Sequence, residues 1–278
     1  MSPIVVTPPV MQTPDRLYKY ETLNARTLQN IKGQILYFGS PLGFNDPYDC
    51  ALTPNIVTPN DDEVEAVRAA YLAKERLTTG QRYELLTKTT QEFRDVLLRA
   101  AYSGIRNSTE KFLNSRGVTC FSERNDDLLM WSHYGGRYKG VCLEFDTSAE
   151  AFEKISPVRY LQSLPTLNVS EILLGQDLEQ AWQLFCTKSE SWSYEREWRA
   201  IHEVTGTKYI YPPQALTAVY FGPDIDNESL EIVCLVLAGQ NETVRYYKGE
   251  RSKTEFRVEF KEFTYTSYLH AKKQGLRT

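Results

Sequence analysis

A block of helix-forming residues interrupts a chain that otherwise reads as short strands, and this arrangement constrains the fold most. Residues 61–115 are rich in Ala, Leu, Glu, Lys and Arg at helical spacing, with breaks at Thr78 to Gly80 and near Ser103 to Ser108. Strand-like stretches such as RLYKYETL, RGVTCFSE and EWRAIHEV lie on both sides. We therefore predict the α+β class: curved mixed or antiparallel sheets with an insertion of two long helices and one short one.

No Pro-, Gly- or Ser-rich linker divides the chain, so we predict one main domain. Residues 1–15 form a flexible N-terminal segment in this prediction. A single α+β domain follows over 16–265, with the helical insert at about 61–115, and residues 266–278 form a polar C-terminal tail.

Capping residues mark several helix boundaries. Asn24 is expected to cap a short helix that Gly33 closes, between two strands. A longer helix is predicted from Ser170 to Glu190, and another is predicted to begin with Asn227 as its cap.

Composition and charge exclude several classes of protein. The net charge of −4 and the pI of about 5.6 argue against a general polyanion binder. The N-terminal residues lack a signal-peptide pattern, and no run approaches the roughly 18 apolar residues of a membrane span. We therefore expect a cytoplasmic protein with no membrane partner. The five cysteines are widely spaced, and we interpret them as structural thiols and predict no metal site.

Aromatic, acidic and amide residues gather in four compact segments. These are FNDPYD (44–49), CFSE (120–123), MWSHYG with KGVCLEFD (130–146) and WSYEREWR (192–199). Packing alone does not favour such clustering of rare, large residues. We predict that the four segments share a polar pocket.

Each segment also has a purely structural interpretation. FNDPYD is either a turn held by Asn and Asp side chains or a loop whose Asn45 and Asp46 contact a ligand. A helix over MWSHYGG places Met130, His133 and Tyr134 on one face, which suits either a core or a ligand-binding surface.

The segment WSYEREWR suggests acid–base chemistry. On a strand, Glu195 and Glu197 lie on one face and Arg196 on the other. Two close carboxylates raise one another's pKa when buried, which suits an acid–base pair; the alternative is an exposed strand with weak surface ion pairs. Lys188, shortly before them, is suited to neutralising an acid or holding an anion.

Together these segments resemble a bacterial family of domains of unknown function, DUF2971. The resemblance rests on LYKY, ILYFGSPLGFNDPYDC, CFSE, MWSHYGGRYKGVCLEFD and K-x-x-x-WSYEREWR, and it spans roughly residues 16–222. A more distant resemblance is to ADP-ribosyltransferases. Their opening strand, helix and strand are similar to LYKY through ILYF, and their late-strand E-x-E motif is similar to Glu195-Arg196-Glu197.

The second resemblance implies a split sheet, NAD as substrate, and transfer of ADP-ribose to a protein or nucleic-acid acceptor, or to water. Such enzymes include toxins and phage-defence effectors. It implies Glu197 as the carboxylate that stabilises the ribosyl cation, with Glu195 or His133 activating the acceptor. The first strand departs from the family pattern, because Lys19 stands where Arg or His is usual. Residues expected to contact NAD or a related nucleotide are Lys19, Tyr20, Tyr37, Asn45, Asp46, Trp131, Tyr134, Lys188 and Trp192.

Two other functions stay open from the sequence. A metal-dependent nuclease would use the carboxylates of Asp46, Glu123, Glu195 and Glu197 and would require a divalent ion. A non-enzymatic module would bind a nucleotide or peptide through an aromatic pocket that includes Trp131.

Overall fold

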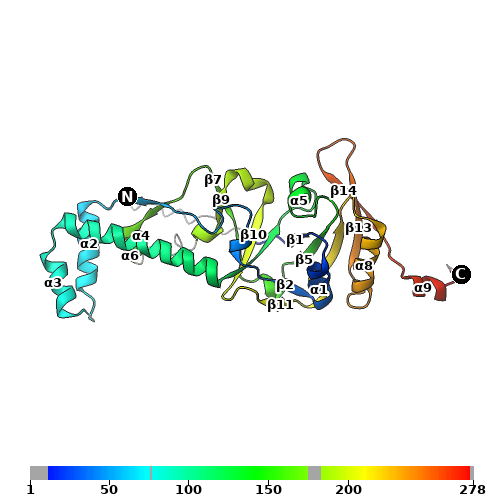
Figure 1. Cartoon of the computed structure of the whole chain (residues 1–278), viewed down its shortest axis with the longest axis horizontal. Helices are drawn as coiled ribbons and strands as arrows, with labels where there is room; N and C mark the ends of the chain where they lie inside the picture. The colour runs from blue at the N-terminus through cyan, green and yellow to red at the C-terminus, as the bar shows by residue number, and fades with distance from the viewer. Residues whose placement is uncertain (1–11, 76, 175–182, 276–278) are drawn as a thin grey trace. The chain divides into compact units, whose positions relative to one another are not determined.

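The structure, a computed structural model, describes residues 12–75, 77–174 and 183–275. It forms two compact units (Figure 1). The sheet unit contains residues up to Gly39, Gly117–Val158 and the chain from Ser193 onward. The helical unit contains Ser40–Arg116 and Arg159–Trp192, and therefore includes the predicted insert.

The sheet unit is built on one mixed sheet of eight strands. In sheet order these are β14 (Val258–Phe263), β13 (Arg245–Arg251), β12 (Leu216–Phe221), β5 (Val141–Asp146), β1 (Arg16–Glu21), β4 (Gly117–Ser122), β10 (Glu197–His202) and β6 (Ile155–Pro157). Neighbouring strands are antiparallel except for β12 and β13. A separate ribbon pairs β2 (Ile35–Tyr37) with β11 (Lys208–Ile210). The predicted α+β class is confirmed, whereas the split into two sheets is not.

Apolar clusters cover both faces of this sheet. On one face, α1 (Ala25–Gly33) and α8 (Asn227–Ala238) contribute Ile31 and Cys234 to a core that includes Leu17. On the other face, α5 (Leu128–His133) contributes Trp131, which packs with Tyr20. Burial of these side chains is the main contribution to the stability of the sheet.

Helix caps explain where α1 and α8 begin. Asn24 caps α1, as predicted, by accepting hydrogen bonds from two backbone N–H groups. The left-handed residue that ends α1 is Gln34, with φ of 53°, rather than Gly33. The predicted cap at Asn227 is wrong by one residue, because the Asp226 carboxylate accepts the Ser229 N–H at 2.7 Å.

The helical unit contains α2 (Asp61–Leu72), α3 (Thr79–Thr87) and α4 (Thr90–Ser115). Each begins with a reciprocal capping box, formed by Asn60, Thr78 and Thr89 respectively. The predicted break near Ser103 to Ser108 is wrong, because α4 runs through it without interruption. One exposed glycine costs a helix only about 1 kcal/mol, which the buried residues on either side offset.

The predicted helix over residues 170–190 is also corrected. The chain forms α6 (Val169–Leu173), and residues 175–182 lie outside the described residues. Beyond them come the 3-10 helices η3 (Leu184–Cys186) and η4 (Glu190–Glu195), with the strand β9 (Thr187–Ser189) between them. Pairing of β9 with β7 (Arg159–Leu161) overrides the local helical pattern.

The remaining elements are short. They are β3 (Asn55–Val57), which pairs with β8 (Thr166–Asn168), the 3-10 helices η1 (Pro41–Gly43), η2 (Glu150–Phe152) and η5 (Pro213–Ala215), and α9 (Tyr268–Lys273). Helix α9 lies in the predicted C-terminal tail. Most of the predicted N-terminal segment, residues 1–11, lies outside the described residues.

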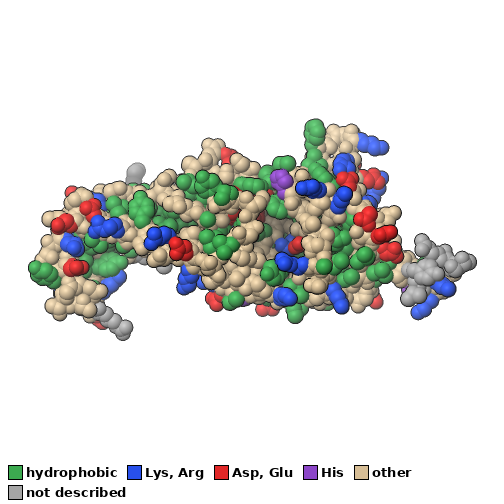
Figure 2. Space-filling model, in the orientation of Figure 1, with side chains coloured by type: hydrophobic (Ala, Val, Ile, Leu, Met, Phe, Trp, Pro, Cys, Tyr) green, Lys and Arg blue, Asp and Glu red, His purple; other side chains and the backbone are tan. Residues whose placement is uncertain are grey.

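The surface charges, the cysteines and the helix lengths bear on what the sequence predicted. On the face drawn in Figure 2, basic and acidic side chains are interspersed. All five cysteines are free thiols, and four of them are buried. Within the described residues, every helix is too short or too polar to cross a membrane.

Candidate functional site

Two motifs from distant parts of the sequence meet in the sheet unit. Nδ1 of His133 lies 3.0 Å from the Tyr194 hydroxyl. Next to this pair, the Tyr134 hydroxyl donates a hydrogen bond of 2.5 Å to Oε1 of Glu195. Glu195 is buried, both tyrosines are half-buried, and His133 is exposed. We call these four residues the Glu195 cluster.

Local structure explains how the four side chains reach one another. The Asp127 carboxylate caps α5 by accepting N–H groups of Leu129 and Met130 at 2.9 and 3.0 Å. His133 is the last residue of this short helix, and Tyr134 is its C-cap. The cluster is thus held at a helix terminus.

Glu195 and Glu197 do not share a strand face, contrary to the prediction. Glu195 ends the 3-10 helix η4, and only Glu197 belongs to β10. Between them Arg196 takes φ of 43°, in the left-handed region, which turns the chain. The backbone carbonyl of Glu195 is fixed by the Ser122 hydroxyl, which donates to it at 2.6 Å.

Glu197 forms a buried ion pair with Arg199. Nε of Arg199 donates to one carboxylate oxygen at 2.6 Å, and the second nitrogen donates to the other at 3.0 Å. The Arg199 side chain is 0% exposed and that of Glu197 is 5% exposed. Burial, together with the charge of Glu197, raises the pKa of the adjacent Cys120 thiol well above its usual value, so this thiol stays protonated.

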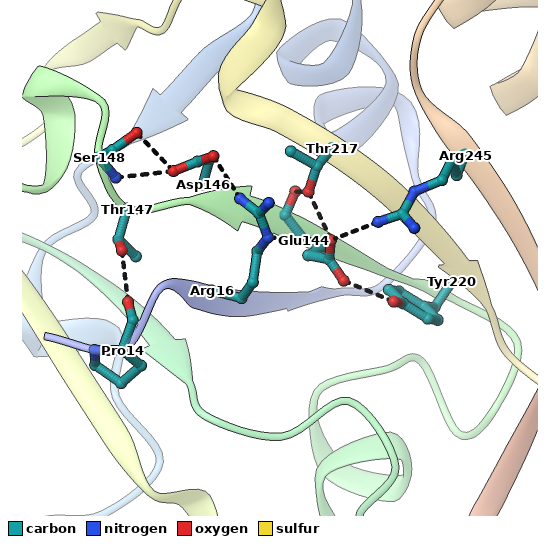
Figure 3. Close-up of polar contacts among 9 residues, drawn as sticks. All are labelled: Pro14, Arg16, Glu144, Asp146, Thr147, Ser148, Thr217, Tyr220 and Arg245. Carbon is teal, nitrogen blue, oxygen red and sulfur yellow. Dashed lines mark hydrogen bonds and ion pairs between the residues drawn. The ribbon is translucent and has the colours of Figure 1, made fainter.

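A second buried carboxylate, Glu144, lies on the same face of the sheet. Figure 3 shows how side chains from several strands converge on it. The hydroxyls of Thr217 and Tyr220 each donate to it at 2.6 Å. Arg245 lies 3.4 Å and Arg16 3.8 Å from Oε1 of Glu144, so both half-exposed guanidinium groups compensate its charge. The carboxylate is therefore held by donors on several sides.

Strand register places Glu144, Tyr18, Ser122 and Glu197 in one row across the sheet. Tyr18 lies opposite Glu144 on one side and opposite Ser122 on the other, and Ser122 lies opposite Glu197. Burial, and next the charge of Glu144, raises the pKa of Tyr18 to about 12. Its phenol is therefore neutral near pH 7.

One family model matches the segment of the chain that contains both motifs of the Glu195 cluster. Residues 130–200 match a family model described as "Protein of unknown function (DUF2971)". The predicted resemblance to this family is confirmed over these residues, whereas the resemblance to ADP-ribosyltransferases stays a prediction. No curated protein and no solved structure matches the chain.

Within the DUF2971 segment, Trp131 has a structural environment. Its side chain is 0% exposed, its indole N–H donates to the Asn125 carbonyl at 2.7 Å, and its ring packs edge-on against Tyr20. A Cβ at Gly135 would lie 2.5 Å from the Trp131 ring, so the glycine permits this close packing. The core interpretation of Trp131 and Tyr20 thus fits their geometry better than ligand stacking.

Lys19 and Tyr37 lie apart from the Glu195 cluster in the fold. Lys19 alternates with Tyr18, so its side chain leaves the opposite face of the sheet. Its ammonium group donates to the Cys120 carbonyl at 3.3 Å and pairs with Glu21 at 3.5 Å. Tyr37 belongs to the ribbon of β2 and β11.

The other four predicted binding residues belong to the helical unit. Asn45 is exposed and Asp46 is buried in the loop after η1. Lys188, on β9, lies over the Trp192 ring with Nζ 5.1 Å from its centroid. These four residues therefore belong to a different unit from the Glu195 cluster.

A hollow of ≈ 420 Å³ also lies in the helical unit. One wall is residues 51–54, and the other is formed by Tyr102, Arg106 and neighbouring residues of α4. This volume suits a small-molecule ligand. None of the residues predicted from the sequence lines it.

Sequence reasoning missed Arg199, Tyr194 and Glu144. The spacing of Glu197 and Arg199 carried a usable signal, because residues two apart on a strand share a face and opposite charges there form pairs. For Glu144 the signal was an acid inside the apolar strand VCLEF, which requires partners when buried.

Proposed function

We propose that the Glu195 cluster binds NAD or a related nucleotide and catalyses transfer of ADP-ribose. The observation that supports this most is a buried carboxylate that accepts a hydrogen bond from the Tyr134 hydroxyl and lies beside an exposed histidine. Loss of nicotinamide breaks the glycosidic bond and leaves an oxocarbenium-like ribose. A negative charge at Glu195 would stabilise that cation.

This proposal gives the two glutamates different roles from those predicted. Arg199 neutralises Glu197 in the core, so the charge of Glu197 serves the fold. Tyr134 orients the Glu195 carboxylate, and the half-buried ring of Tyr194 offers an aromatic surface to the substrate. His133, exposed beside it, removes a proton from the acceptor as the acceptor attacks the ribose.

The test measures nicotinamide release from NAD by the full chain, with water alone and with a mixture of protein and RNA as acceptors. Changing Glu195 to Gln keeps the shape of the side chain and removes its charge. We expect release to fall by roughly 100-fold. The exposed Glu190, in the same 3-10 helix, provides the matched control, and Glu190→Gln should retain activity. Equal activity of the two variants would refute the role of Glu195.

The same assay separates the alternatives. Release that EDTA leaves unchanged supports the proposal, whereas cleavage of nucleic acid that requires a divalent ion supports the nuclease. In the described part of the chain, no three His, Cys, Asp or Glu side chains gather as metal ligands would. NAD binding without turnover would instead indicate a non-enzymatic module.

A further inference from the structure

The hollow in the helical unit lies between one face of a helix and an irregular stretch of chain. Its volume of ≈ 420 Å³ is within the range of small-molecule sites. Residues of α4 between 102 and 110 form one wall, and residues 51–54, just before β3, form the other. Both walls belong to the helical unit, so the hollow does not depend on the sheet unit.

The α4 wall carries polar side chains with no partner in the described chain. Tyr102, Arg106 and Thr109 follow the spacing of one helix face. Tyr102 is 55% exposed, and Arg106 is exposed as well. Within the described residues, neither of these two side chains makes a hydrogen bond, an ion pair or a ring contact. A ligand in the hollow can therefore engage the phenol and the guanidinium group without breaking an existing contact.

Arg106 and Glu110 give this wall two opposite charges that are not paired. They lie one helical turn apart, yet among the described residues neither forms an ion pair. An arginine that precedes a glutamate by one turn is the less favourable order for such a pair. A ligand with a single charge would leave one of the two side chains without a partner. A ligand that carries both a carboxylate and an ammonium group complements both.

Apolar side chains form much of the opposite wall. Leu52 is 6% exposed and Pro54 is buried, and Ile105 adds an apolar side chain from α4. An apolar group of the ligand that packs against these side chains is removed from water, which favours binding. The exposed ring of Tyr102 offers a flat surface beside them. The hollow thus suits a ligand with an apolar body in addition to its two charges.

We infer that this hollow binds a free amino acid with an apolar or aromatic side chain. Arg106 pairs with the carboxylate of the amino acid, and Glu110 accepts hydrogen bonds from its ammonium group. Its side chain packs between Tyr102 and Leu52. This inference is independent of the proposed NAD chemistry, because it concerns residues of the helical unit and is tested by binding alone.

Isothermal titration of the full chain with L-phenylalanine provides the test. We expect saturable binding that Arg106→Gln and Glu110→Gln each weaken roughly tenfold or more, the loss expected for a charged hydrogen bond. Arg99→Gln, the same change at an exposed position of α4 outside the hollow, should leave binding unchanged. Because Arg106 and Glu110 are exposed, both variants should keep the Tm of the wild type, which separates loss of binding from unfolding.

Analogues of phenylalanine test the wild-type chain without any substitution. 3-Phenylpropionate lacks the ammonium group and 2-phenylethylamine lacks the carboxylate, so each should bind roughly tenfold more weakly than phenylalanine. Glycine has both charges but no apolar side chain and should also bind more weakly. Absence of phenylalanine binding at millimolar concentrations, or equal binding by Arg106→Gln, would overturn the inference. Binding of 3-phenylpropionate as tight as that of phenylalanine would overturn it too.

Discussion

Breaking the ion pair between Glu197 and Arg199 on one side should strongly destabilise the sheet unit. Changing Glu197 to Gln removes the negative charge that Glu197 contributes beside the guanidinium group of Arg199, whose side chain is 0% exposed. Breaking a buried pair in this way costs about 3–5 kcal/mol. In a protein of 150–250 residues each 1 kcal/mol lowers Tm by about 2–4 °C, so we expect Tm to fall by roughly 6–20 °C.

Differential scanning calorimetry measures this change, with Glu190→Gln as the control because Glu190 is exposed. The double variant Glu197→Leu with Arg199→Met removes both charges and fills the space with apolar atoms. It should recover most of the lost stability, since replacing a buried ion pair by packed apolar residues is often neutral or stabilising. A fall of less than about 2 °C for Glu197→Gln would refute the reasoning. A double variant that is as unstable as Glu197→Gln alone would also refute it.

Two further predictions concern stability. Thr89→Ala removes the hydroxyl that accepts the Glu92 N–H in the capping box of α4, and it should lower the free energy of unfolding, measured in urea, by about 1 kcal/mol. Glu92→Gln keeps an acceptor in the side chain and should lower it by less. Equal losses for the two variants would contradict this prediction. Hydrogen bonds from Ser148, and next from Arg16, lower the pKa of Asp146 from 3.8 to about 2. Its contribution to stability is therefore full above pH 3.8 and is lost as the pH falls toward 2, so unfolding midpoints of wild type and Asp146→Asn should converge over that range.

The sequence was sufficient to predict features that depend on a few adjacent residues. Asn24 before ARTLQNIK, and the alternation of Trp198 and Ala200 with Arg199, each depend on a few adjacent residues, and the structure confirms them. The continuous α4 was harder to predict, because apolar anchors such as Phe112 outweigh a weak helix former such as Gly104 only once they are buried.

Features set by long-range pairing could not be derived from the sequence. A single left-handed residue, Arg196, separates Glu195 from the strand of Glu197, and such a residue other than glycine has little sequence signature. The contact of Tyr134 with Glu195 joins residues 61 positions apart. The motifs indicated which residues to examine, but only the sheet register shows that Lys19 and Tyr18 leave opposite faces.

The chain passes between the two units four times, and this has a consequence for synthesis on the ribosome. The helical unit is made of two stretches, so it cannot be complete until Trp192 has emerged, long after its own α4. The sheet must wait longer still, because β12, the partner of β5, begins only at Leu216. Nascent β1 and β4 are therefore translated well before β10, which pairs with β4, and before β12, β13 and β14, which complete the sheet beyond β5. Helices α2 to α4, whose contacts are closer in sequence, are the elements that can form first. No single cleavage of the chain would release either unit intact.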